Sequence, residues 1–210
     1  MATEDFTTYT ETDADSKLSV LASIATFTAA ATRYKTYNLY YDKGAGHFGN
    51  FTHLITILTH NNTAGGTSME TTHWMVSNQT GDGRAGEVST HGLQVYSYGY
   101  TGSPYQFAVY DHNSGNADYY IATPASLWYC TISRSSTTLQ MLIYSDSGRT
   151  SLTDTVSVSC ETTTYRYISA ISGYNDGVGT TETDNAYTKD LDLQESVAAT
   201  VKQLAALGVG

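Results

Sequence analysis

The sequence predicts an all-β sandwich or barrel that folds as one domain. Short runs rich in Val, Ile, Thr and Tyr recur along the 210 residues, and such runs are typical of β-strands. Turn-forming Gly, Pro, Asn, Asp and Ser separate them every 8 to 15 residues, the spacing of sandwiches and barrels. Helical patterns do not alternate with these runs, so α/β folds are excluded.

About ten strands are expected in all. Residues 18–31 are apolar and Thr-rich and predict one strand, and residues 33–42 predict a Tyr-rich one. Residues 51–60 carry apolar side chains on both faces, which predicts a central, buried strand. A polar loop is expected over 61–72. Further strands are expected at 73–77, 93–100, 106–110 and 118–122.

The strand pattern is clearer in the C-terminal half. Residues 127–133 and 139–144 flank the polar segment 134–138, and this arrangement predicts a β-hairpin. Turn residues separate the segments that follow. Strands are expected at 153–160, 165–171 and 186–193.

Both cysteines fall on predicted inward faces. Cys130 shares a strand face with Trp128 and Ile132, and Cys160 ends an alternating apolar run. We expect two buried, reduced thiols, since free Cys is among the most buried residue types. A disulfide between neighbouring strands is the alternative. Zinc is not supported, because the sequence has neither a CxxC motif nor a Cys/His cluster.

The chain divides into an N-terminal arm (1–16), the β-sandwich (17–193) and a C-terminal helical tail (194–210). The tail has apolar residues at helical spacing and Gly208 as a stop signal. A single amphipathic helix on a sandwich packs on its own domain or on a neighbouring subunit. We expect the second, with an assembly stripe of Val197, Val201, Leu204 and Leu207.

Composition limits the partners. Charged residues make up only 14% of the chain and the net charge is -10, which opposes binding to nucleic acid and to anionic membranes. No apolar stretch approaches the length of a membrane span, and the N-terminus lacks the features of a secretory signal. The pattern predicts a soluble protein made in the cytosol, although the Thr- and Tyr-rich, Lys-poor texture is typical of proteins that work outside cells.

Five segments of the C-terminal third carry a family resemblance. They are LWYCTISR at 127–134, IYSDSGRT at 143–150, LTDTV at 152–156, YRYI at 165–168 and SGYNDG at 172–177. This order resembles the back half of concanavalin A-like jelly-roll modules, the lectin/glucanase and laminin-G superfamily, especially versions found in phage virion proteins. The resemblance implies a jelly roll of two packed antiparallel sheets of six or seven strands, extending over about 17–193. It implies little about the ligand.

Catalytic motifs are missing. The Glu-x-Asp-x-x-Glu strand of the family's hydrolases would place two carboxylates at catalytic spacing. The nearest fragments, Glu11-Thr12-Asp13 and Glu182-Thr183-Asp184, lack the third carboxylate. A Gly-x-Ser-x-Gly nucleophile motif is also absent. We therefore expect no enzyme activity and no cofactor.

A metal site is not expected either. Asp111, Asn113 and Asp118 surround Gly115 and could offer oxygen ligands to calcium, but a β-turn with Asx caps fits this spacing better. Isolated loop or strand residues are the expectation for the scattered histidines, which are His47, His53, His60, His73, His91 and His112.

Tyrosine is the one enriched side chain with binding potential. Tyr96, Tyr98 and Tyr100 share one face of a predicted strand, and Tyr119 and Tyr120 belong to another. Such rings stack on sugars and are frequent in protein interfaces. These tyrosines have three possible roles: they fill or edge the sandwich, contact another subunit, or contact a glycan.

Together these features predict a non-catalytic virion structural protein: a coat, decoration or tail component that acts through subunit contacts. Its expected partners are further copies of itself or other virion proteins. Assembly in the host cytoplasm and release by lysis would reconcile the missing signal with the extracellular texture. The alternative is an extracellular carbohydrate-binding module, or a degenerate glycoside hydrolase, that acts on polysaccharide.

Overall fold

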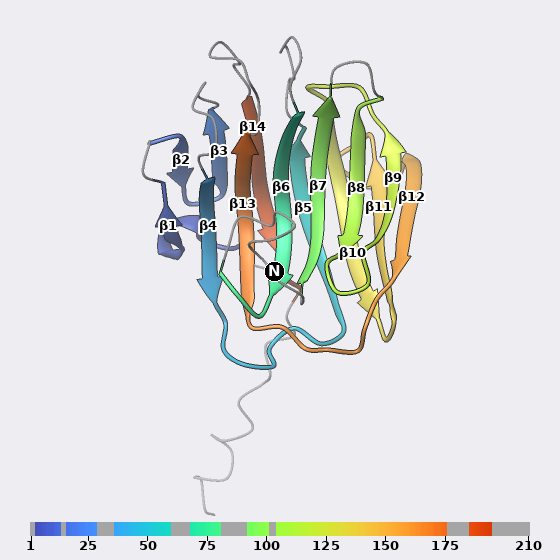
Figure 1. Ribbon diagram of the computed structural model, residues 1–210. Coiled ribbons are helices and arrows are strands. Elements are labelled where there is room, and N and C mark those ends of the chain that lie inside the picture. Colours follow the sequence, from blue (N-terminus) through green and yellow to red (C-terminus); the bar gives the residue numbers. More distant parts are fainter. Residues whose placement is uncertain are drawn as a thin grey trace, which may run out of the picture.

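The computed structural model has two seven-stranded antiparallel sheets packed face to face (Figure 1). It describes residues 3–13, 16–28, 36–59, 68–80, 92–100, 104–175 and 185–194. The front sheet has the order β1 (Thr10–Thr12), β4 (Thr36–Asp42), β13 (Tyr167–Asn175), β6 (Ser68–Ser77), β7 (Gly92–Tyr100), β8 (Gln106–Asp111) and β9 (Asn116–Ile121). The back sheet has the order β12 (Leu152–Ser159), β11 (Thr138–Tyr144), β10 (Leu127–Ser135), β5 (Phe51–Leu58), β14 (Asn185–Asp192), β3 (Ile24–Thr28) and β2 (Leu18–Leu21).

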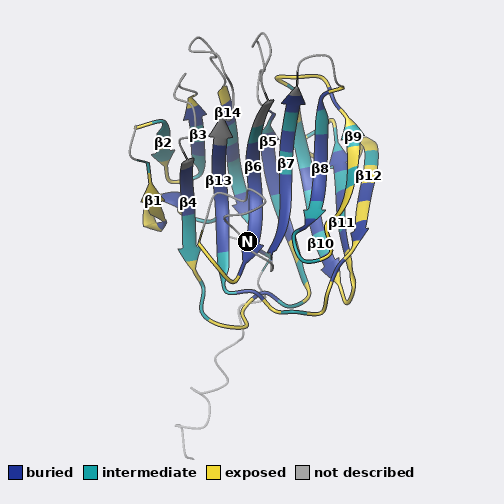
Figure 2. Ribbon diagram, viewed as in Figure 1, coloured by how far each residue is buried: buried dark blue, intermediate teal, exposed yellow. Residues whose placement is uncertain are grey.

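The core lies between the sheets and follows the two-residue period of the strands. Leu139, Met141 and Ile143 of β11 are fully buried, and the residues between them are half-buried on the outer side. Figure 2 shows the buried residues concentrated on the central strands of both sheets. The central position predicted for 51–60 is confirmed, because β5 pairs with β10 on one side and with β14 on the other.

Two strand predictions in the N-terminal half are wrong. Residues 18–31 were expected as one strand, but β2 and β3 form a hairpin around a turn at Ala22 and Ser23, where the Ala22 carbonyl accepts the Phe6 N–H. The loop expected over 61–72 ends earlier, because β6 begins at Ser68. Thr71 and Thr72 are buried there and pair with β7, so their polar groups do not exclude them from the sheet.

Part of the expected N-terminal arm packs onto the sandwich. A short 3-10 helix, η1 (Phe6–Thr8), buries the Phe6 ring completely, and the Glu4 N–H donates to the Leu191 carbonyl at 2.7 Å. Strand β1 then pairs with β4. The predicted assembly helix over 195–210, with Val197, Val201, Leu204 and Leu207, lies outside the described residues.

Both cysteines are buried and free, as predicted. Cys130 pairs across the ladder with Ile143, and Ile143 pairs with Asp154, six residues before Cys160. At about 3.3 Å per residue, the two thiols are on the order of 20 Å apart, so a disulfide between them is excluded. Burial raises the pKa of both thiols, which keeps them protonated and unreactive. Within the described ranges, no helix has the length and apolar character that crossing a membrane requires.

Candidate functional site

The outer face of the front sheet gathers several of the predicted tyrosines. On β7, Leu93 and Val95 are buried in the core, so Tyr96 and Tyr98 project from the opposite face. Tyr96 pairs with Ala108 of β8, which pairs with Tyr119 of β9. The register therefore brings Tyr96 and Tyr119 into one row across three strands. The side chain of Tyr100, at the end of β7, is outside the described part of the chain.

Tyr120 does not belong to this face. It lies on the inner side of β9, where its ring meets Trp128 edge to face with centroids 5.6 Å apart. Trp128 is half-buried and packs against the core, on the same side of β10 as Cys130 and Ile132, as predicted. Tyr119 and Tyr120 lie on one strand, as predicted, but they do not share a face, because neighbouring strand residues point to opposite sides of the sheet.

A polar network lies beside the tyrosines. The Gln94 amide donates to Glu70 Oε1 at 2.9 Å and to Thr72 Oγ1 at 2.6 Å. Gln94 Oε1 lies 2.8 Å from Nε2 of His112, and since this oxygen only accepts, Nε2 carries the proton. Burial lowers the pKa of His112 to about 4, so its ring is neutral near pH 7. These bonds use every donor of the buried Gln94 amide and fix its orientation.

Tyr110 joins the aromatic and polar parts of this face. Its ring meets Tyr96 edge to face at 6.4 Å and His112 at 4.8 Å. Burial, followed by the nearby charge of Glu70, raises the pKa of Tyr96 to about 12, so the hydroxyl stays protonated and can both donate and accept. We call Gln94, Tyr96, Tyr98, Tyr110 and Tyr119 the front platform.

The front platform offers contact groups. Its rings present apolar faces with polar tips, and its amide and hydroxyls are neutral. The carboxylate beside it, Glu70, already accepts from Gln94. Across the described part of the chain, no three His, Cys, Asp or Glu side chains come together as a metal-binding group.

The acidic loop after β8 forms an Asx turn, as expected. Asp111 is fully buried, and its carboxylate accepts the Asn113 N–H at 3.0 Å and the Ser114 hydroxyl at 2.7 Å. Gly115 has φ +73°, a conformation that glycine adopts at little cost. Asp118 instead accepts the Ser157 N–H of β12 at 2.8 Å. Each carboxylate therefore stabilises backbone, and Asp118 ties the edges of the two sheets together.

The histidines do not form a common site in the described residues. His53 is buried and its Nδ1 accepts the Trp74 indole N–H at 3.0 Å. Burial lowers its pKa to about 3. His73 is also buried, 2.8 Å from the Ser97 hydroxyl, and His47 is exposed. His60 and His91 lie outside the described ranges.

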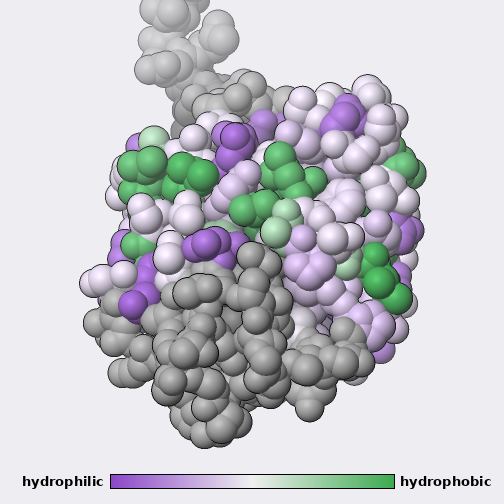
Figure 3. All heavy atoms as spheres, turned by 90° about the horizontal axis from the view of Figure 1, so that it is seen from above, coloured by the Kyte–Doolittle hydropathy of each residue, from purple (hydrophilic) through white to green (hydrophobic). Residues whose placement is uncertain are grey.

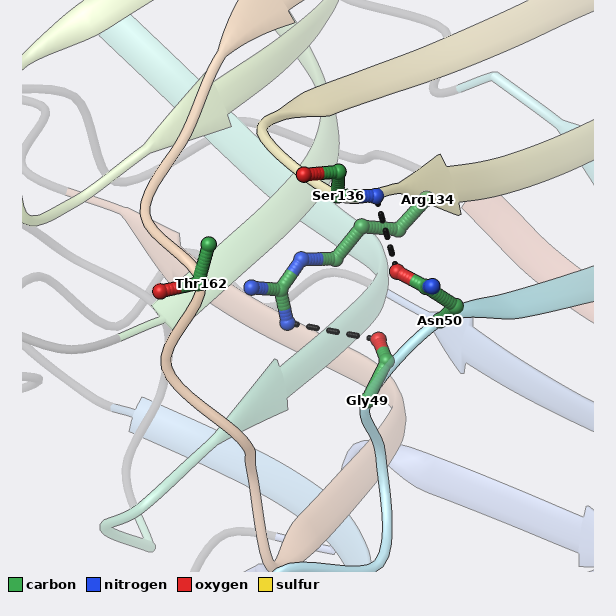
Figure 4. Close-up of a pocket in the computed structure, with 5 residues that line it drawn as sticks. All are labelled: Gly49, Asn50, Arg134, Ser136 and Thr162. Atoms are coloured by element: carbon green, nitrogen blue, oxygen red, sulfur yellow. Dashed lines mark hydrogen bonds between the residues drawn. The ribbon is translucent and has the colours of Figure 1, made fainter.

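A cavity of about 310 Å³ opens at one end of the sandwich, lined by Gly49, Asn50, Arg134, Ser136 and Thr162 (Figure 4). Arg134 is 3% exposed and donates to the carbonyls of Gly49 (3.3 Å), Thr163 (2.5 Å) and Glu161.

Sequence reasoning placed Arg134 in the hairpin loop. The signal for its inward position was the period of two that continues from Cys130 and Ile132. Because the guanidinium holds loop carbonyls together, we assign it a structural role.

The end of the sandwich seen in Figure 3 was compared with the front platform as a possible contact surface. Figure 3 shows its hydrophobic side chains as separate green patches divided by polar ones. The coloured part of this end therefore has no continuous apolar surface.

Comparisons with known proteins identify the fold. No family model matches the sequence, and no curated protein matches it either. Solved structures do match: the legume lectin-like domain from Entamoeba histolytica has a TM-score of 0.56 and 12% identity, over 88% of each chain.

The lectin UEA-II complexed with galactose has a TM-score of 0.55 and 9% identity, over 89% of this chain and 94% of the lectin. The VIP36 exoplasmic/lumenal domain, bound to Ca²⁺ and mannose, has a TM-score of 0.54 and 9% identity, over 90% of this chain and 85% of that domain. The chain thus has the legume lectin-like, concanavalin A-like jelly-roll fold that its C-terminal segments resembled, and these matches carry no sign of a virion.

Proposed function

We propose that this protein is a non-catalytic glycan-binding module and that the front platform is its contact surface. The observation that carries the proposal is the row in which Tyr96, Ala108 and Tyr119 lie side by side, next to the fixed amide of Gln94. Aromatic rings stack on the apolar faces of sugars, and their hydroxyls can bond to sugar hydroxyls. The buried Gln94 amide, whose donors are all used within the protein, fixes the platform and does not contact the sugar.

The charges around the platform favour neutral glycans. The Glu70 carboxylate lies close enough to Tyr96 to help raise the pKa of its hydroxyl, and the whole chain carries -10. Acidic sugars would meet repulsion there and would lose affinity. The sugars named with two similar structures, galactose and mannose, are also neutral, which agrees with this preference but establishes it only for those proteins.

A glycan array probed with the full chain, followed by calorimetry on the strongest neutral hit, tests the proposal. Tyr119 is 49% exposed, so Tyr119→Ala should leave the fold intact and weaken binding about 10-fold or more, as loss of one stacking contact predicts.

Tyr144→Ala, on the outer side of the back sheet, is the matched control and should bind as the wild type does. Absence of any hit, or equal loss in both variants, would reject the platform as the site. Release of reducing sugar from a bound glycan would contradict the non-catalytic assignment.

The second candidate is a virion subunit that acts as a coat, decoration or tail component. Exposed apolar residues on the back sheet, Leu21, Leu127 and Leu152, favour contact with other subunits, although the similar structures give no sign of a particle. Localisation to a particle after assembly in a host cytoplasm would follow from it. Light scattering beside the glycan array separates the two functions. Assembly without glycan binding supports the virion subunit, and glycan binding by a small species supports the lectin-like module.

A further inference from the structure

We infer that the cavity lined by Arg134 binds a small carboxylate (Figure 4). None of its lining residues belongs to the front platform, so the inference goes beyond the proposed function and does not depend on glycan binding there. It also leaves Arg134 its structural role, because the bound carboxylate would use N–H groups that the loops do not use.

Arg134 has more hydrogen-bond donors than its partners in the protein use. A guanidinium carries five N–H groups. Nη1 donates to the carbonyls of Gly49 and Thr163, and Nη2 donates to that of Glu161. Nε is buried and has no partner in the part of the chain that the structure describes. Two donors, one at Nε and one at Nη2, therefore remain unused.

The positive charge of Arg134 has no direct counter-ion. None of the ion pairs between described residues includes it. The Asp111 and Glu161 carboxylates accept from neighbouring hydroxyls instead. The Tyr165 ring lies 5.3 Å from the guanidinium carbon, and burial raises the pKa of both Tyr165 and Cys160 more strongly than Arg134 lowers it, so both stay neutral. A buried cation without a partner is costly, and an anion in the cavity would offset that cost.

The cavity leads from solvent to the unused donors. In Figure 4, the edge of the guanidinium that carries Nε lies toward Ser136 and Thr162, while the opposite edge bonds to Gly49. Ser136 and Thr162 are exposed, and their hydroxyls can donate to a bound oxygen. Asn50 fixes the rim, because its Oδ1 accepts the Ser136 N–H at 2.8 Å. An anion can therefore enter past the two hydroxyls.

The donors and the charge favour a carboxylate as the ligand. Nε and Nη2 lie on one edge of the planar guanidinium, which matches the two oxygens of a carboxylate. Arg134 is the one charged residue among those that line the cavity, so a phosphate dianion would be only half neutralised in a chain that carries -10. The volume of about 310 Å³ corresponds to roughly ten water molecules of about 30 Å³ each, enough for a carboxylate on one sugar-sized ring.

Calorimetry and NMR titration of the full chain with D-glucuronate, acetate and glucose test the inference. Both carboxylates should bind once per chain, and glucuronate should do so with a Kd of roughly 1 mM, as expected for a ligand of its size. Their binding should shift the resonances of the Arg134 Nε–H and of the Gly49 and Ser136 amides. Glucose, the neutral counterpart, should leave these resonances unchanged.

Ser136→Asp should block the site from within, because its carboxylate would occupy the position of the ligand. Ser136 has φ +55°, a conformation that aspartate adopts more readily than most residues. The affinity for glucuronate should fall about 10-fold or more, as loss of a charge-assisted pair predicts. Ser135→Asp is the matched control, since Ser135 is exposed, does not line the cavity and points to the other face of β10. Its affinity should stay within about 2-fold of the wild type.

Four results would overturn the inference. Absence of carboxylate binding up to about 50 mM would leave Arg134 with its structural role alone, and tighter binding of inorganic phosphate would reject the ligand class. Shifts confined to other residues, or equal loss of affinity in both variants, would reject the site. The thermal transition shows whether each variant is folded, and Thr162→Asp replaces Ser136→Asp if the latter is not.

Discussion

Replacing Arg134 by Met should destabilise the fold through the two loops that its guanidinium joins, one at Gly49 and one at Glu161 and Thr163. Hydrogen bonds to a charged group contribute about 1.5 to 3 kcal/mol each, so the three bonds to carbonyls contribute at most about 5 to 9 kcal/mol. Keeping the charge out of water costs several kcal/mol, and an apolar replacement recovers that cost. The carbonyls of Gly49 and Thr163 are in half-buried residues and that of Glu161 is in an exposed one, so water can replace part of the lost bonding.

The expected net loss for Arg134→Met is therefore about 2 to 4 kcal/mol of unfolding free energy. Urea unfolding followed by tryptophan fluorescence measures it, and faster amide exchange should appear at residues 161–165. Arg166→Met is the matched control. Arg166 is 44% exposed and forms a bidentate pair with Asp42 at 2.8 and 2.6 Å, so its loss should cost less than about 1 kcal/mol. An Arg134→Met protein within about 0.5 kcal/mol of the wild type, or more stable than it, would refute the reasoning.

Three further experiments test how Trp128, the two cysteines and His53 are buried. Trp128→Ala should cost about 2 kcal/mol in chemical denaturation, below the roughly 3 to 5 of a fully buried Trp, because the ring is half-buried; a loss under about 1 kcal/mol would contradict its contact with the core. Cys130 and Cys160 should react with a thiol reagent slowly in the native protein and should count as two thiols after denaturation without reductant; zero thiols would contradict the free state. His53 is neutral when folded, with its pKa lowered by burial to about 3, so its contribution is complete above the ordinary pKa of about 6.5 and is lost as the pH falls toward 3. From pH 7 to pH 5 this amounts to about 2 kcal/mol, which His53→Gln should remove and His47→Gln should retain; identical pH dependence in both variants would exclude His53 as the source.

Local alternation explains why the hairpin near the C-terminus could be predicted from the sequence. Strands β10 and β11 each alternate buried and half-buried residues. The two-residue period of the side chains and the turn residues between the strands therefore predict the same hairpin. The boundaries expected at 127–133 and 139–144 differ from the observed ones by at most two residues. The hairpin of β2 and β3 was missed because its turn has no Gly, Pro, Asn or Asp and only the single Ser23 within an apolar, Thr-rich run. The start of β6 was missed because its Ser and Thr residues are typical of loops.

The candidate site could be predicted only in part, because a sequence does not specify which strands become neighbours. Period two placed Tyr96 and Tyr98 on one face, and these two residues do share it. Tyr110 and Gln94 were missed, since their contact depends on the register between β7 and β8. Period two also separates Tyr119 from Tyr120, but it does not reveal which of them faces the core. The position of the second sheet decides that.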